Sequence, residues 1–404
     1  MTFLLNLGRR IFKRPPSLPI RLPTTGFQTI DSTQLIEEER FSWYSPTFYY
    51  PVRLGNVFNL RYQVVGKLGF GAHSTMDHEF VALKVCVINS PPAKREIEIF
   101  NHIKPLMSKT THEGSLSIRT LMDHFEIANE EGVYQCLVHK PMGAGLDSLR
   151  VRCPQQRLTE TLLQKTLIRL LTALDFLHTE AKVIHTDVQE GNILLRPPKY
   201  SDLQILENEE LSKPIPRKID GDRVIYLSRE LGTPYYDEPN LCDFGEARFG
   251  GRTYMDDIQP YQYRAPEVLL RIPWDEKVDI WSVGVLIWDL FERKNLFRIV
   301  GEERNRNERQ HHLAQMVALL GAPPKDFLER SKGDIPWKYF DREGNWKGEV
   351  EVKTDSLEQQ VESLEGERKK QFLEFMRKML RWKPEERYTA KQLLEDPWLR
   401  DIRV

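Results

Sequence analysis

The stretch that most constrains this sequence is VIHTDVQEGNILL, residues 183–195, in which polar residues stand between two short apolar segments. Such apolar segments are typical of buried strands, so His185, Asp187 and Asn192 should be held on a rigid turn. An aspartate five residues before an asparagine suits phosphoryl transfer, because the carboxylate can orient a hydroxyl nucleophile and the amide oxygen can ligate magnesium. The alternative is a buried polar turn in which Asp187 and Asn192 only satisfy backbone groups.

Two motifs downstream favour the first interpretation. Leu241–Gly245 reads LCDFG, with Asp243 after a short apolar run, and Tyr263–Glu267 reads YRAPE. Both occur in the order of the protein-kinase signature set, so the chain resembles a eukaryotic-type protein kinase over Leu60–Leu399. Thr186, in place of the usual arginine of that loop, is typical of the kinases that phosphorylate arginine-serine-rich splicing factors. The chain therefore resembles an SR-protein kinase, most similar to the divergent fungal-type members.

The resemblance implies an α+β, two-lobed fold, with a small β-rich N-lobe that has one helix and a large α-helical C-lobe. A length of 404 residues and a hydrophobic content of 40% allow one large two-lobed domain or two modest ones. We expect a partly disordered N-terminal extension over residues 1–57 and a kinase domain over 58–401, divided into lobes at 58–142 and 143–401, with insertions at 197–240 and 304–370.

Charge and cysteine content exclude other classes of protein. The net charge of −1 argues against a general binder of polyanions. The cysteines have no CxxC pairing and no histidine at zinc-ligand spacing, so we expect neither a zinc site nor a disulfide framework, and a reducing compartment fits best. No apolar run reaches membrane-spanning length. The cysteines are Cys86, Cys136, Cys153 and Cys242.

The N-terminus allows two interpretations. Met1–Ile30 has no acidic residue and several basic ones, which is the composition of a mitochondrial transit peptide. The alternative is a disordered basic tail, since prolines end any helix there after about one amphipathic segment. We therefore expect the cytoplasm and nucleus as the location, with the mitochondrion as the alternative. The basic residues are Arg9, Arg10, Lys13, Arg14 and Arg21.

A nucleotide-binding half is expected before residue 100. Tyr62–Leu68 is β-branched and alternating, so it predicts a strand that enters a glycine-rich turn. Gly69, Gly71 and Ser74 would fill the positions of a phosphate-covering loop. A lone GxG pattern is weak evidence; its value comes from the VALK motif that ends at Lys84, the lysine expected to hold the α- and β-phosphates.

The partner of that lysine should lie on the next helix. Ala93–Met107 has apolar residues at helical spacing and predicts the helix of the small lobe. Glu96 is favoured for an ion pair with Lys84, with Glu98 as the alternative.

The hinge between the lobes is expected in Tyr134–Met142, after the last strand of the small lobe. The family pattern puts His139 at the gatekeeper position, although it could be an ordinary half-buried histidine. The same pattern implies that the backbone groups of Lys140 and Met142 contact adenine.

Two departures from the family pattern weaken the expectation of activity. Between Met76 and Lys84 there is little room for a second strand, a turn and half of a third strand. Either the second strand is vestigial or a segment has been lost. Gln189 stands where the family has a lysine that neutralises the γ-phosphate. Together they suggest a pseudokinase or scaffold as the alternative.

The C-terminal half carries the expected supports of the site. Thr159–Ala181 and Lys277–Arg293 predict buried helices, and the resemblance implies that Asp279 accepts backbone donors from the loop at residue 185. Glu267 should form a buried ion pair with Arg387.

The segments between these helices show little helical or strand periodicity. Between Arg196 and Leu241 we expect mostly solvated loop, with a β-ribbon within Ile219–Arg229 and no catalytic role. Thr253 and Tyr254 could be phosphorylated, but we expect assembly without such a switch. Acidic residues could help dock arginine-rich substrate, or could be only a wet surface; they are Asp326, Glu329, Asp334, Asp341 and Glu343.

The resemblance implies a non-specific serine/threonine protein kinase that transfers the γ-phosphoryl group of ATP to protein hydroxyls, in arginine-serine-rich substrates linked to mRNA splicing. Asp187 would accept or orient the hydroxyl proton, Asn192 and Asp243 would hold Mg²⁺, and Lys84 with Glu96 would fix the nucleotide. We expect a monomer whose partners are ATP and protein, without direct nucleic-acid or membrane binding. Small-molecule phosphotransferases of related fold lack the Glu267–Arg387 pair, which argues against that class.

Overall fold

The computed structural model describes residues 19–68, 72–76, 79–196, 199–229, 238–298 and 308–402. The chain divides into two compact units. Unit 1 comprises Met1–Ile97, Thr120–Ala144 and Arg196–Tyr235. Unit 2 comprises Glu98–Arg119, Gly145–Leu195 and Tyr236–Val404. The boundary falls inside helix α2 (Pro91–Met107), which confirms the helix expected there.

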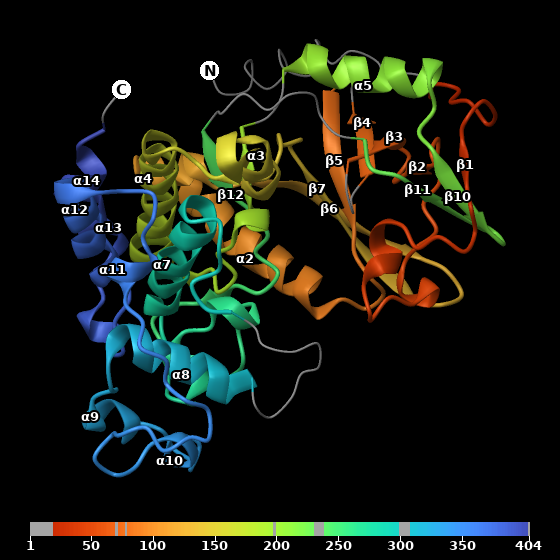
Figure 1. The fold of residues 1–404 in the computed structure, drawn as a ribbon. Helices are drawn as coiled ribbons and strands as arrows, with labels where there is room; N and C mark the ends of the chain where they lie inside the picture. The colour runs from red at the N-terminus through yellow and green to blue at the C-terminus, as the bar shows by residue number, and fades with distance from the viewer. Residues whose placement is uncertain are drawn as a thin grey trace. The chain divides into compact units, whose positions relative to one another are not determined.

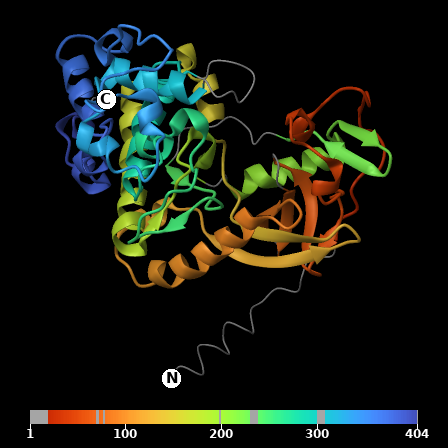
Figure 2. The ribbon, with the colours of Figure 1, turned by 90° about the horizontal axis from the view of Figure 1, so that it is seen from below.

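A six-stranded antiparallel sheet forms the centre of unit 1 (Figures 1 and 2). Alternating apolar residues of its strands, among them Val64, Val81 and Val138, form a core on one face. Val52 and Leu54 of the N-terminal extension pack against this core. In spatial order the strands are β2 (Val57–Phe58), β3 (Tyr62–Lys67), β4 (Ala72–Met76), β5 (Glu79–Val85), β7 (Val133–His139) and β6 (Leu121–Ala128).

The expectation of a vestigial second strand is wrong. Strand β4 has five residues and pairs with β5 from Ala72↔Leu83 to Met76↔Glu79. It also pairs with β3, from Gln63↔Thr75 to Lys67↔Ala72. Since only residues 77 and 78 separate the paired residues Met76 and Glu79, the chain needs just the shortest hairpin connection. The segment before Lys84 therefore accommodates both strands.

The long insertion belongs to unit 1 and not, as expected, to the large lobe. It contains helix α5 (Tyr200–Ser212), where loop was expected, and a hairpin of β10 (Arg217–Asp220) and β11 (Arg223–Tyr226), close to the expected ribbon. Strand β1 (Thr29–Ile30) of the N-terminal extension pairs parallel to β10. Leu203 and Leu206 of α5 bury their side chains against Val65 and Phe80 of the central sheet, which explains the helix.

Charged side chains join the insertion to the N-terminal extension and to β3. Lys218 and Glu39 form an ion pair of 2.8 Å, and both side chains are buried. Lys67, at the end of β3, pairs with Glu38 at 2.8 Å, and its carbonyl accepts a hydrogen bond of 2.8 Å from the amide of Arg229. The strand that leads to the glycine-rich turn is thus held by two segments that are far apart in sequence.

Helices α4 and α7 form the core of unit 2, as their leucine and valine patterns predict. In α7 nearly every residue is buried, including Trp281 and Trp288. In order, the helices are α3 (Leu146–Arg152), α4 (Glu160–Phe176), α6 (Pro266–Leu269), α7 (Lys277–Phe291), α8 (Glu308–Leu320), α9 (Lys325–Leu328), α10 (Pro336–Tyr339), α11 (Leu357–Gln360), α12 (Gly366–Arg377), α13 (Ala390–Leu394) and α14 (Pro397–Arg400).

Two short strand pairs complete unit 2. Strand β8 (Val183–Ile184) pairs with β13 (Arg248–Phe249), and β9 (Ile193–Leu195) pairs with β12 (Pro239–Leu241). None of the four cysteines forms a disulfide bond. Within the described ranges, no helix has both the length and the apolar character that crossing a membrane requires.

The expected ion pair between Glu267 and Arg387 is present in unit 2. The two guanidinium nitrogens donate to the two carboxylate oxygens at 2.6 and 2.7 Å, and both side chains are fully buried. Arg387 also donates to the carbonyls of Lys277, Arg381 and Trp382. The pair therefore ties α6 to the start of α7 and to the chain before α13.

Glu267→Ala should destabilise unit 2 strongly, because the charge of Arg387 would stay buried without its partner. Loss of one member of a buried pair costs about 3–5 kcal/mol. Thermal unfolding followed by circular dichroism should show a large fall in Tm. Glu386→Ala, at an exposed neighbouring position, is the matched control and should change Tm little; equal Tm values for the two variants would contradict the role given to the pair.

Candidate active site

The loop over residues 185–192 has the rigid frame that its sequence predicts. Strands β8 and β9 flank it and are mostly buried. His185 and Thr186 have no exposed surface. The backbone of Thr186 is left-handed, with φ of 65°, and its hydroxyl donates to the carbonyl of Glu246 at 2.7 Å. The segment after Asp243 is therefore joined directly to the loop.

Asp279 of α7 fixes the backbone of this loop, as the family resemblance implies. Its carboxylate accepts hydrogen bonds from the amides of His185, at 2.8 Å, and Thr186, at 2.7 Å. The ring nitrogen Nε2 of His178 lies 2.8 Å from the same carboxylate. Asp279 is completely buried, and a buried carboxylate needs such donors.

His185 connects the loop to the LCDFG segment. Its Nδ1 accepts from the amide of Asp187 at 3.3 Å, and its Nε2 lies 3.0 Å from the carbonyl of Cys242. This network assigns the proton to Nε2. The ring also packs edge-on against Phe244, at a centroid distance of 4.9 Å. His185 therefore contacts both segments: it accepts from the amide of Asp187, and it lies against the carbonyl of Cys242, the residue before Asp243.

Two side-chain amides hold the carboxylate of Asp187. Asn192 Nδ2 donates to one oxygen at 2.6 Å, and Gln189 Nε2 donates to the other at 2.7 Å. Asn192 Nδ2 also lies 2.9 Å from the carbonyl of Asp187. The carboxylate of Asp187 is therefore held by side-chain amides, whereas Asn192 also satisfies a backbone carbonyl, as the alternative of a polar turn expects. Burial raises the pKa of Asp187 above its ordinary value, the charge of Asp243 adds to the rise, and the two amides and His185 oppose it.

Asp243 lies at the start of the segment after β12. Its backbone is left-handed, with φ of 61°, and one carboxylate oxygen accepts from the amide of Gly245 at 3.2 Å. The charges of Asp243 and Asp187 act on each other. The amide oxygen of Asn192 and the carboxylate of Asp243 are hard oxygen donors, the ligand type that Mg²⁺ prefers, and a cation there would relieve the repulsion between the carboxylates. The residues therefore fit a divalent cation.

In unit 1, the ion pair expected of Lys84 forms with Glu96 and not with Glu98. Lys84 Nζ lies 2.9 Å from Glu96 Oε2. Glu96 is buried, whereas Glu98 is on the exposed side of α2. The lysine comes from β5 and the glutamate from the first turns of α2, so the pair links the central sheet to the helix.

His139 is the last residue of β7 and is buried rather than half-buried; its place as gatekeeper stays a prediction. Its Nδ1 lies 3.1 Å from the carbonyl of Thr120, and its Nε2 lies 3.9 Å from Glu96 Oε1. Lys140 is exposed and Met142 is buried; their contact with adenine stays a prediction.

The glycine-rich turn is only partly described. Gly69 and Gly71 lie outside the described residues. Ser74 lies in β4, where it pairs with Val64 and Val81. The assignment of these residues to the phosphates stays a prediction.

The sequence did not predict a cluster of four polar side chains next to the loop. Arg150 of α3 binds Glu190 of the loop through hydrogen bonds of 2.8 and 3.0 Å. The hydroxyl of Tyr263 donates to Asp289 of α7. Burial raises the pKa of Asp289 to about 7; the charge of Glu190 adds to the rise, and Tyr263 and Arg150 oppose it. Asp289 is the second aspartate, after Asp279, in a mostly apolar helix, which was the available signal.

Comparison with known proteins agrees with this geometry. Residues 62–399 match the protein kinase domain family. A serine/threonine protein kinase of Aspergillus fumigatus is 43% identical over 401 residues, which cover 96% of this chain and 97% of that protein. The serine/threonine-protein kinase SRPK of Physarum polycephalum is 29% identical, with 91% and 92% covered. Mouse SRSF protein kinase 3 is 25% identical, with 90% of each chain covered.

Glu96→Gln should lower the rate of phosphoryl transfer, because a charge-assisted hydrogen bond of Lys84 becomes neutral. A loss of about 1.5–3 kcal/mol corresponds to about one to two decades of kcat/KM. Glu98→Gln, two residues along the same helix, is the control and should leave kcat/KM unchanged. Steady-state assays over a range of ATP concentrations measure both, and a larger effect of the Glu98 variant would reverse the assignment.

Asp289→Asn should remove a pH dependence of stability. Folded Asp289 keeps its proton to about pH 7, whereas an unfolded aspartate loses it near pH 3.9. Between these values the folded state binds one proton more, so stability falls as pH rises through this window. The Tm of the variant should therefore gain on that of the wild type as pH rises from about 4 to about 7. For Asp147→Asn, at an exposed site on α3, the plot of Tm against pH should run parallel to that of the wild type. A parallel plot for Asp289→Asn as well would contradict the claim that folded Asp289 binds a proton in this pH range.

Proposed function

Because the chain belongs to the protein kinase family and is an SRPK-like serine/threonine kinase, we propose that its substrates are serines in arginine-serine-rich protein segments, such as those of splicing factors. The observation that carries the enzymatic part is the placement of Asp187. Its carboxylate is held by the side-chain amides of Asn192 and Gln189, at 2.6 and 2.7 Å, and the charge of Asp243 acts on it. The substrate class is supported by Thr186 and by the names of the SRPK and SRSF protein kinase relatives.

The residues act mainly by positioning and by charge neutralisation. Asp187 orients the serine hydroxyl and accepts its proton as the oxygen attacks the γ-phosphorus of ATP and the bond to the β-phosphate oxygen breaks. Lys84, held by Glu96, binds the α- and β-phosphates. Asn192 and Asp243 would hold Mg²⁺, which neutralises phosphate charge when it is bound. Donors at both oxygens of Asp187 favour its ionised form against the effect of burial, which keeps it able to take the proton.

Gln189 has a defined role that differs from that of the family lysine. Its amide donates to Asp187 at 2.7 Å, so it orients the base. It brings no positive charge to the γ-phosphate. Replacing a charge-assisted hydrogen bond of about 1.5–3 kcal/mol by a neutral one slows catalysis by about one to two decades but does not abolish it. The other argument for a pseudokinase was the short segment between Met76 and Lys84. That argument is lost, because every residue of β4 pairs with β5.

Assembly without a phosphorylation switch is supported by the contacts of the segment after Asp243. Arg248 pairs with Asp256 at 2.8 Å. The hydroxyl of Tyr254 donates to the carbonyl of Phe249 at 2.7 Å, and the Tyr254 ring stacks on Trp274 at a centroid distance of 4.8 Å. The segment is thus ordered by groups that are already present in the unmodified chain.

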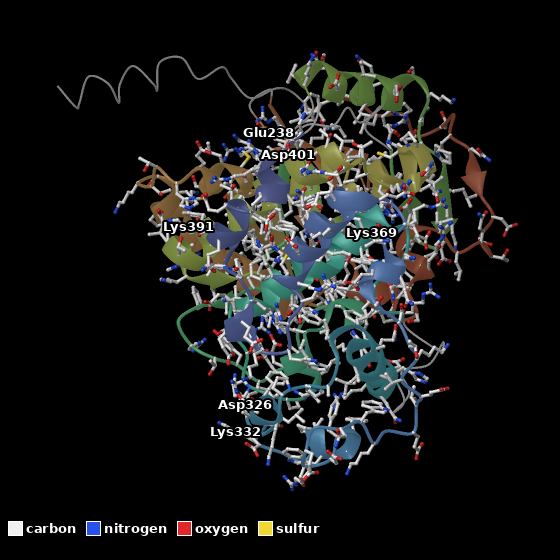
Figure 3. All side chains as sticks on the ribbon, turned by 60° about the vertical axis from the view of Figure 1, so that its left-hand side comes forward. Glu238, Asp326, Lys332, Lys369, Lys391 and Asp401 are labelled. Carbon is white, nitrogen blue, oxygen red and sulfur yellow. The ribbon has the colours of Figure 1, made fainter. Side chains whose placement is uncertain are left out.

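Acidic side chains of unit 2 could dock an arginine-rich substrate, but several are already engaged. Asp326, labelled in Figure 3, pairs with Lys383 at 2.6 Å and with Arg330 at 3.5 Å. Asp341 accepts from two backbone amides of its own turn. Asp334 and Glu343 are exposed and are the better candidates for docking, since Glu329 lies 3.9 Å from Lys325.

The cellular setting is also part of the proposal. We propose a monomer in the cytoplasm and nucleus; the location is supported by cysteines without disulfide bonds, which suit a reducing compartment. The basic segment Met1–Ile30 keeps the mitochondrion as the alternative.

The purified chain should phosphorylate serine in an arginine-serine repeat peptide in the presence of Mg-ATP. Asp187→Asn should reduce the rate by several decades, because the amide cannot accept the proton. A matched peptide with lysine in place of arginine should be a poorer substrate. Transfer to the lysine peptide at an equal rate would contradict the substrate class, and equal rates for wild type and Asp187→Asn would contradict the mechanism.

Gln189→Lys should raise kcat, because it restores a positive charge beside the transferred phosphoryl group. The gain expected from a charge-assisted bond is about one decade or more. Gln189→Met, which removes the donor to Asp187 at similar size, should lower kcat. Single-turnover measurements separate this step from product release, and a lower kcat in the lysine variant would contradict the role given to Gln189.

A further inference from the structure

Ser228 lies just after β11 of the insertion, where three segments of unit 1 meet. Its amide and its hydroxyl donate to the two carboxylate oxygens of Glu37 in the N-terminal extension, at 2.8 and 2.7 Å. The amide of the next residue, Arg229, donates to the carbonyl of Lys67 at the end of β3. Ser228 therefore closes the contact between the extension and the insertion, beside the strand that leads to the glycine-rich turn. None of these residues has been given a role in phosphoryl transfer.

Ser228 has the neighbour that the serines of the proposed substrates have. Arg229 follows it directly, and the sequence has one other serine next to an arginine, Ser331, which follows Arg330. The hydroxyl of Ser331 donates to the backbone carbonyl of Leu270 at 3.0 Å, whereas that of Ser228 donates to a carboxylate. Of these two serines, Ser228 is thus the one at which a phosphate would act directly on a charged contact.

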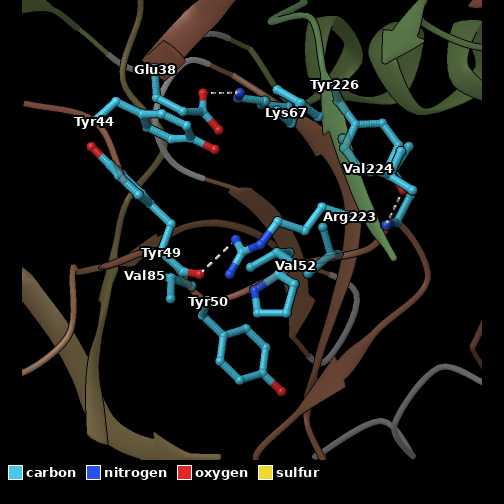
Figure 4. Close-up of a pocket in the computed structure, with 15 residues that line it drawn as sticks. Glu38, Tyr44, Tyr49, Tyr50, Val52, Lys67, Val85, Arg223, Val224 and Tyr226 are labelled. Atoms are coloured by element: carbon cyan, nitrogen blue, oxygen red, sulfur yellow. Dashed lines mark hydrogen bonds and ion pairs between the residues drawn. The ribbon is translucent and has the colours of Figure 1, made fainter. Parts of the chain in front are cut away.

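Beside Ser228, one ammonium group already serves two carboxylates. Lys67 Nζ lies 2.8 Å from Glu38 and 3.7 Å from Glu37. The pair of Lys67 and Glu38 forms part of the wall of the cavity in Figure 4, where a dashed line marks it. A phosphoserine carries a charge of about −1.5 to −2 at neutral pH. On Ser228 that charge would lie against the carboxylate of Glu37, and like charges in contact repel each other.

Arg229 does not supply the missing positive charge. Its guanidinium donates to Glu209 and Glu210 of α5, at 3.1 and 2.9 Å, and to the carbonyl of Lys213 at 2.9 Å. A phosphate on Ser228 would have to compete with both carboxylates for this guanidinium. The modified serine would therefore be repelled by the carboxylate that it now contacts, and not neutralised by the arginine that follows it.

The backbone of Glu37 favours the opening of this contact. Its φ is 49°, in the left-handed region that side chains rarely adopt. The two hydrogen bonds from Ser228 hold the carboxylate while the backbone keeps this conformation. When the contact opens, the backbone strain is relieved, and the hydroxyl of Ser228, which is half-buried in the closed state, becomes accessible to another molecule.

We propose that Ser228 is phosphorylated by a second copy of this chain, and that the phosphate releases the N-terminal extension from the insertion. This inference rests on the proposed function. In the second copy, Asp187 accepts the proton of the Ser228 hydroxyl as its oxygen forms a bond to the γ-phosphorus of ATP. The bond from that phosphorus to the β-phosphate oxygen breaks, and ADP leaves. The new phosphate repels Glu37 and competes with Glu38 for the ammonium group of Lys67.

The Asp187→Asn chain is a test substrate that cannot phosphorylate itself. Incubated with Mg-ATP and a small amount of the wild-type chain, it should gain a phosphate at Ser228, at a rate that rises with the amount of wild type. Mass spectrometry of its peptides locates the phosphate, and the arginine-serine peptide is assayed in the same mixture. Phosphorylation of the peptide without Ser228 would overturn this inference alone. Phosphorylation of neither would overturn the proposed function together with it.

Hydrogen exchange measures the release of the extension. The amides of Glu39 and Phe41 are hydrogen-bonded within it. In the phosphorylated chain they should exchange at least about tenfold faster, because the loss of one charge-assisted hydrogen bond corresponds to about one decade or more. The double variant Asp187→Asn/Ser228→Ala keeps the amide bond to Glu37 but takes no phosphate there, so the same incubation should leave its exchange rates unchanged. Equal rates in the phosphorylated and unphosphorylated Asp187→Asn chain would overturn the second half of the proposal.

Discussion

The carboxylate of Asp279 is the interaction on which the site in unit 2 depends. It accepts two backbone amides of the catalytic loop at 2.8 and 2.7 Å, and it has no exposed surface. These bonds set the left-handed turn at Thr186, which in turn directs His185 to the segment before Asp243 and Asp187 to its two amide donors. A buried charge is costly unless it is fully hydrogen-bonded, so the cost of burying Asp279 is offset only when the loop has this one conformation.

The same principle organises unit 1, where the N-terminal extension and the insertion are joined by buried charges. Lys218 with Glu39 joins the insertion to the N-terminal extension, and Arg217 with Glu210 joins β10 to α5 within the insertion. Replacing such pairs by apolar residues can be neutral for stability, but breaking one of them is expensive. We infer that they favour specificity, namely the arrangement in which Lys67, next to the glycine-rich turn, is held by Glu38 and by the amide of Arg229.

The sequence predicted the parts of the site that depend on local spacing. Asp187, Asn192 and Asp243 belong to short motifs whose backbone fixes their geometry, and the helical spacing of α2 was enough to favour Glu96 over Glu98. It did not predict that the insertion packs in unit 1, because the partners of Leu203 and Lys218 lie more than a hundred residues earlier in the chain. It also misjudged β4, since counting full strand lengths ignored how short a hairpin connection can be.

Hydrogen exchange at the amides of His185 and Thr186 tests the central claim most directly. In the wild type both amides should be strongly protected, because each donates to a fully buried carboxylate. In Asp279→Asn the side-chain NH₂ group cannot accept, so at least one of the two amides should lose its protection, with a fall in the rate of phosphoryl transfer. Unchanged protection and an unchanged rate in Asp279→Asn would contradict the account.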